Sequence, residues 1–69
     1  MNDFDVHIHY DKIDKIFIAE VKELSGCIAH GHTRLEALNN IETAIQEWIS
    51  IANENNWEIP EAKDAALSF

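Results

Sequence analysis

Two pairs of histidines with the same spacing are the residues of this chain best suited to chemistry. His7 and His9 stand two apart in "VHIHY", and His30 and His32 stand two apart in "AHGH". Residues two apart on a β-strand point to the same face, so each pair could offer two imidazoles to one zinc ion. A metal-dependent hydrolase using all four histidines is therefore one alternative. No cysteine or carboxylate spacing accompanies the pairs, which favours histidines without a metal, and we expect no cofactor.

The other reactive side chains give weaker signals for catalysis. Cys27 is the only cysteine, and its neighbours Gly26 and Ile28 predict a small buried apolar residue. Thiol activation needs an electropositive environment, which an acidic chain does not offer. Asp3 and Asp5 could hold a divalent cation, although a solvated N-terminus explains them as well. We expect no catalytic residue and no enzymatic activity.

Three short segments have the pattern of β-strands. "FDVHIHY" (residues 4–10) alternates apolar and polar side chains, which predicts a strand with one buried face. "KIFIAEV" (15–21) is apolar on both faces in its middle, which is typical of a central strand. "CIAH" (27–30) resumes the pattern after the polar break "KELSG". His7 and His9 thus belong to the first strand, His30 ends the third, and His32 falls just before the start of the helix.

A long amphipathic helix is predicted over residues 34–54. Thr33 and Glu36 have the spacing of a capping box, in which each side chain bonds a backbone N–H at the helix start. The apolar stripe then follows at steps of three and four residues: Leu38, Ile41, Ile45, Trp48 and Ala52. A short extended segment around residues 57–59, stopped by Pro60, completes the expected order β-β-β-α-β. We expect an α+β fold, a small antiparallel sheet packed on this helix, as one domain over residues 1–69.

One helix can cover only one face of a sheet, so the apolar side chains on the opposite face remain without cover. Ile16 and Ile18 need cover on the side opposite Phe17 and Ala19. A chain of 69 residues also has a small core, for which oligomerisation is a common remedy. We therefore expect a homodimer or a higher homo-oligomer. The candidate interface residues are Ile16, Ile18, Trp48, Ile51 and Trp57.

The charge of the chain limits the kinds of partner that it can bind. Thirteen acidic residues against five basic ones give a net charge of -8, and residues 35–62 contain six glutamates and no Lys or Arg. Because nucleic-acid binding depends on Lys and Arg displacing counterions, we expect no direct nucleic-acid partner. A basic protein partner is favoured instead. No apolar run is long enough to span a membrane, and the acidic start is unlike a signal peptide, so we expect a cytoplasmic protein without membrane contact.

An ordered set of short motifs also resembles a known family. It comprises Ala19-Glu20-Val21, Glu23-Leu24, Gly26-Cys27, Ala29, Gly31, Thr33, Glu36-Ala37, Asn40, Ala44-Ile45, Trp48 and Ile59-Pro60. Over residues 16–61 this set resembles the HicB-type antitoxin family. The resemblance implies a partial ribonuclease H-like fold and a signature formed by Gly26, Cys27, Gly31, Thr33, Glu36 and Ala37. It further implies a non-enzymatic protein that neutralises a small basic toxin, of the HicA type, which cleaves messenger RNA.

Three departures from the family pattern qualify what the resemblance implies. Ser25 stands where the family usually has proline, and His32 stands where it usually has aspartate. We expect His32 to be a polar residue at the helix start and not a metal ligand. Many relatives continue into a DNA-binding domain after the shared region. The sequence continues only to Phe69, so the expectation is a stand-alone domain without operon repression.

Overall fold

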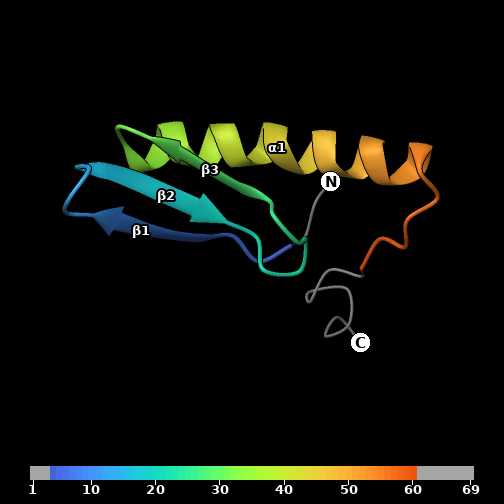
Figure 1. Cartoon of the computed structure of the whole chain (residues 1–69). Helices are drawn as coiled ribbons and strands as arrows, with labels where there is room; N and C mark the ends of the chain where they lie inside the picture. Colours follow the sequence, from blue (N-terminus) through green and yellow to red (C-terminus); the bar gives the residue numbers. More distant parts are fainter. Residues whose placement is uncertain (1–3, 61–69) are drawn as a thin grey trace, which may run out of the picture.

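The structure is a computed structural model that describes residues 4–60, in which a three-stranded antiparallel sheet packs against one long helix (Figure 1). The strands are β1 (His7–Asp11), β2 (Ile16–Glu20) and β3 (Ile28–Gly31), and the helix is α1 (Arg34–Glu54). The sheet order β1-β2-β3 puts β2 in the centre. The predicted α+β class and the predicted central strand are confirmed. The first strand begins three residues later than its alternating pattern, which starts at Phe4.

The turn between β1 and β2 is built without glycine. Oδ1 of Asp11 accepts hydrogen bonds from the backbone N–H groups of Ile13 (2.9 Å) and Asp14 (3.2 Å). The backbone N–H of Lys15 then donates to the carbonyl oxygen of Asp11 at 2.7 Å, with Lys15 in the left-handed region at φ 57°. The Asp11 side chain therefore holds the turn, while Lys15 takes the left-handed conformation that glycine commonly supplies.

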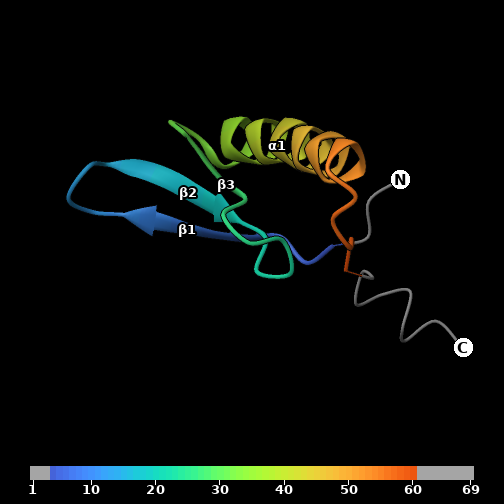
Figure 2. The same ribbon diagram turned by 45° about the vertical axis from the view of Figure 1, so that its right-hand side comes forward.

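The strand register divides the sheet into two different faces. Ile8, Ala19 and Ala29 form one cross-strand row, which lies on the side of helix α1, and Ala19 is fully buried there. His9, Ile18 and His30 form the next row, which by alternation points to the opposite side. Helix α1 covers only the first side, mainly above β3 (Figure 2).

The helix begins with the predicted cap, in a slightly different form. The backbone N–H of Glu36 donates to Oγ1 of Thr33 at 3.0 Å, as expected of an N-cap threonine. The carboxylate of Glu36 accepts instead from the backbone N–H of His32 at 2.6 Å, one residue earlier than in the usual box. Helix α1 runs over Arg34–Glu54, so both of its predicted ends are confirmed.

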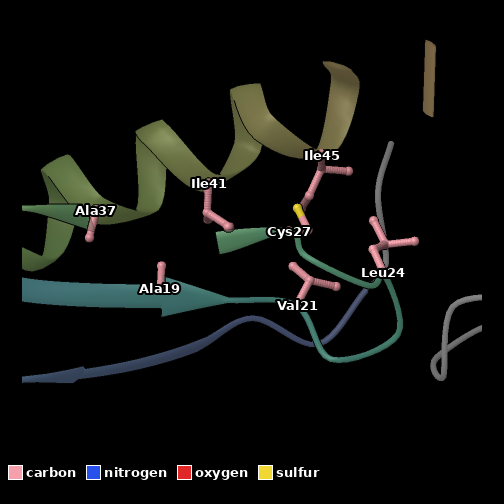
Figure 3. Packing of buried hydrophobic residues seen from close by; sticks show 7 residues of the cluster. All are labelled: Ala19, Val21, Leu24, Cys27, Ala37, Ile41 and Ile45. Atoms are coloured by element: carbon pink, nitrogen blue, oxygen red, sulfur yellow. The ribbon is translucent and has the colours of Figure 1, made fainter. Parts of the chain in front are cut away.

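The core is a single apolar cluster between the sheet, the β2–β3 loop and the helix (Figure 3). Its centre consists of buried side chains from all three: Ala19, Val21, Leu24, Cys27, Ala37, Ile41 and Ile45. The loop adds to the core because its backbone is closed on itself. The Val21 N–H donates to the Cys27 carbonyl oxygen at 3.1 Å, and the Cys27 N–H donates to that of Leu24 at 3.0 Å. Cys27, which the sequence predicts to be a buried apolar residue, lies in this core.

The segment after the helix does not form the expected last strand. Asn55 caps the helix, and Asn56 turns the chain through the left-handed region at φ 58°. The backbone N–H of Trp57 then donates to the carbonyl oxygen of Ala52 at 2.8 Å, so the chain folds back on the helix end. Residues 57–60 have no strand pairing. The apolar pattern at 57–59 reflects this local contact and not a sheet position.

Candidate protein-binding surfaces

The structure separates the four histidines that suggested a metal site. His7 and His9 lie on β1 and His30 on β3, all three exposed on the side of the sheet away from the helix. His9 and His30 are two strands apart, about 10 Å between backbones, with Ile18 between them. Zinc needs its ligand atoms within about 2 Å of the ion. Within residues 4–60, no three His, Cys, Asp or Glu side chains are grouped to hold a metal ion.

His32 lies apart from the others, at the start of the helix. Its Nδ1 is 3.5 Å from Oε1 of Glu36, and both side chains are exposed. The same carboxylate oxygen accepts the backbone N–H of His32, so residue 32 is held by both its backbone and its ring. The alternative site composed of His7, His9, His30 and His32 is therefore not assembled in this chain.

The histidines of β1 and β3 border an apolar patch that none of the elements within residues 4–60 covers. We define the open sheet face as the side chains that alternate away from the helix: His7, His9, Asp11, Ile16, Ile18, Glu20, Ile28 and His30. At its centre a shallow hollow of about 160 Å³ is lined by Ile16, Ile18, Ile28, Ala29 and His30. Ile28 is 59% exposed. The candidate interface residues Ile16 and Ile18 lie together here, as their pattern predicted.

Ile28 belongs to this patch although the sequence did not single it out. Strand β3 has four residues, too few for a clear alternation, and the sequence places Ile28 beside the buried Cys27. The signal that could have found it is the register: Glu20 pairs with Ile28, so Ile28 shares the face of Ile18 and Glu20.

The remaining candidate interface residues lie at the far end of the helix. Trp48 and Trp57 are in tilted contact, with ring centroids 6.2 Å apart. Trp48 packs against the core, and its Nε1–H donates to the carbonyl oxygen of Ser25 at 2.9 Å. Trp57 and Ile51 stay about half exposed. This end of α1 is separate from the open sheet face, so the five candidates do not form one surface.

A second surface is defined by charge. Helix α1 carries exposed carboxylates at Glu36, Glu42, Glu47 and Glu54, and residues 35–60 contain no Lys or Arg. At 3.6 residues per turn, the intervals of 11 and 7 residues bring Glu36, Glu47 and Glu54 back to within about 20° of one direction. We call this row the acidic helix row. It lies on the outer side of the helix, away from the buried Ile41 and Ile45.

Cys27 has the environment of a structural residue. Its side chain is 5% exposed, and burial raises the pKa of its thiol above the ordinary value. A raised pKa keeps the group as the less reactive thiol, because the thiolate is the nucleophile. A further pocket lies against the β2–β3 loop, and Cys27 is one of the residues that line it.

The signature residues of the resemblance also have structural roles. A Cβ atom at Gly31 would meet the backbone of Glu36 and Ala37, and Gly26 adopts a φ of +79°. Asn40, from the same set of motifs, donates from Nδ2 to the carbonyl oxygen of His30 at 2.7 Å. These contacts join β3 to the helix and explain why the motifs surround this junction.

Comparison with known proteins gives a family match over most of the chain. The family model described as UPF0150-like matches residues 6–60, which include the whole sheet and the helix. The chain belongs to the UPF0150-like family. A relative in this family is UPF0150 protein Ta0767 of Thermoplasma acidophilum, which is 38% identical over 47 residues, 68% of each chain. No solved structure matches the chain. Among the described residues, no helix is both long and apolar enough to cross a membrane.

Proposed function

We propose that this member of the UPF0150-like family is an antitoxin-like module that binds and neutralises a small basic toxin of the HicA type. On this proposal the protein acts in the cytoplasm by binding and has no catalytic role. The resemblance of residues 16–61 to HicB-type antitoxins supports a HicA-type toxin as the partner. The buried, unactivated Cys27 and the separated histidines are consistent with a binding role.

The observation that carries the proposal is the acidic helix row. Glu36, Glu47 and Glu54 lie on one side of helix α1. The helix has no Lys or Arg after Arg34. Complementary charge speeds the encounter of two proteins and disfavours wrong partners. A basic toxin would therefore approach this row, and its association rate would fall as ionic strength rises.

Charge reversal in the row tests the proposal. The protein is co-expressed with the small basic protein encoded beside it, and growth and complex formation are measured. We expect Glu47→Lys/Glu54→Lys to abolish rescue of growth and to weaken the complex at least tenfold. The matched control is Asp14→Lys/Glu42→Lys, which makes the same change in net charge at exposed positions outside the row. It should retain rescue.

Two outcomes would overturn the proposal. Equal losses in both double variants would mean that only net charge matters and that the row is not the docking surface. Absence of any rescuing basic neighbour, with pull-down recovering only the protein itself, would leave the second candidate function: an orphan regulatory or structural domain that oligomerises. The uncovered apolar patch of the open sheet face is the observation that favours this candidate.

A further inference from the structure

We propose that the open sheet face binds a second copy of this chain, face to face about a two-fold axis along the row His9–Ile18–His30. The inference does not depend on the toxin. It starts from an apolar centre: Ile16, Ile18 and Ile28 are contiguous across β2 and β3 and line a common hollow. The helix lies on the other side of the sheet; on the open sheet face Ile28 is 59% exposed, whereas Ile16 and Ile18 are partly buried.

The charges of the face select the occupant. The open sheet face contains no Lys or Arg, so it offers nothing to a nucleic-acid backbone. It has only two carboxylates, Asp11 and Glu20, beside three histidines, so a basic protein would find the acidic helix row more attractive. Because the chain has a net charge of -8, most of the molecular surface repels a second copy. On the open sheet face such a copy meets only the two carboxylates of Asp11 and Glu20, around an apolar centre.

The register also makes the face self-complementary in one orientation. His7 and Glu20 are paired on one side of the central row, and Asp11 and Ile16 are paired on the other. A two-fold axis along the central row runs the strands of the two copies in opposite directions and exchanges these two pairs. His7 then faces the Asp11 of the second copy, and Glu20 faces its Ile16. An axis along β2 would instead bring the two Glu20 carboxylates together, which is unfavourable.

The size of the face sets the strength of the contact. Three strands about 4.8 Å apart and five residues of about 3.3 Å each give a face of roughly 14 by 17 Å. Its area of about 240 Å² is less than a third of the roughly 800 Å² per partner that is typical of stable complexes. The dimer should therefore be reversible, with a monomer–dimer equilibrium that shifts with protein concentration.

Sedimentation velocity of the full-length chain across a range of concentrations tests the inference. We expect a concentration-dependent dimer and at least tenfold weaker association for Ile28→Lys. The new lysine can pair with Glu20 on the neighbouring strand, which limits the cost to the monomer fold. The matched control is Ile13→Lys at the β1–β2 turn, where the side chain is 91% exposed and lies off the face. It should leave dimerisation unchanged, and circular dichroism checks the fold of both variants.

A second pair of variants tests the orientation. His7→Glu would place a negative charge opposite Asp11 of the other copy and should weaken the dimer relative to the original chain. Gln46→Glu, which adds the same negative charge at an exposed position of helix α1 on the other side of the sheet, should not. A monomer at all concentrations would overturn the inference. So would a dimer that survives Ile28→Lys, which would indicate pairing through another surface, such as the free edge of β1 or of β3, and so would equal effects of His7→Glu and Gln46→Glu.

Discussion

Helix α1 begins so close to strand β3 that a Cβ atom on Gly31 would lie 2.5 Å from the backbone nitrogen of Ala37. The other near atoms are Glu36 C and Cβ, both at 2.8 Å; since the Cβ position is fixed by the backbone, a side-chain rotation cannot relieve the clash. Gly31 is buried, and Phe17 is its partner across the sheet. The close approach of strand and helix therefore depends on the absence of one methyl group.

Gly31→Ala should destabilise the protein by about 1–3 kcal/mol, the usual cost of forcing extra volume into a packed site. The measurement is urea unfolding followed by far-ultraviolet circular dichroism. Gly26→Asn is a suitable control, because Gly26 has a φ of +79° but open space around it, and asparagine tolerates that backbone conformation. A Gly31→Ala variant as stable as Gly26→Asn would contradict the close approach.

The helix cap gives a second prediction. Thr33→Ala removes the hydroxyl that accepts the Glu36 N–H and should cost about 1 kcal/mol. Thr33→Ser keeps the acceptor and should remain within a few tenths of a kcal/mol of the original protein. Thermal unfolding of the three proteins at one concentration provides the comparison. Equal melting temperatures for the alanine and serine variants would show that the cap bond contributes nothing.

The fold could be predicted because its determinants are local. Thr33 and Glu36 mark the start of the helix within a single turn, and the run around Phe17 that is apolar on both faces marks the central strand. The last strand could not be judged in the same way. Whether Trp57 pairs with a strand or turns back onto Trp48 depends on contacts across the fold, and the left-handed turn at Asn56 decides for the second.

The candidate surfaces were predictable to different degrees. Ile16 and Ile18 follow from a strand that is apolar on both faces while only one helix is present to cover it. The acidic helix row follows from composition and helical periodicity. The separation of His9 from His30 could not be predicted, because it depends on the order of the strands, which places Ile18 and the whole of β2 between them.

Cys27 leads to a prediction about pH. Burial raises the pKa of its thiol in the folded protein, so the folded state favours the protonated form. The associated stability is fully present below the pKa of the unfolded thiol, about 8.5, and is lost as pH rises through the higher folded value. We expect the urea midpoint of the original protein to fall more steeply above about pH 9 than that of Cys27→Ala, which lacks the titrating group. Parallel pH profiles would contradict this linkage.

The same residue should resist chemical modification. With its side chain 5% exposed and its thiol protonated at neutral pH, Cys27 should react with a thiol reagent only when the protein unfolds. Labelling at pH 7.5 should therefore be slow in buffer and rapid in concentrated urea. Rapid labelling of the folded protein would instead indicate that the β2–β3 loop opens readily.

The indole of Trp48 fastens this loop to the helix. Its Nε1–H donates to the carbonyl oxygen of Ser25, 23 residues away, and its ring contacts Trp57. Trp48→Phe keeps an aromatic ring but removes the donor, so we expect a loss of about 0.5–1.5 kcal/mol, the net value of such a bond. Trp57→Phe is the matched control, since it removes an indole from the same aromatic contact but not from the loop bond. If the two variants lose the same stability, the contact between the rings, and not the Ser25 bond, is what holds this end of the helix.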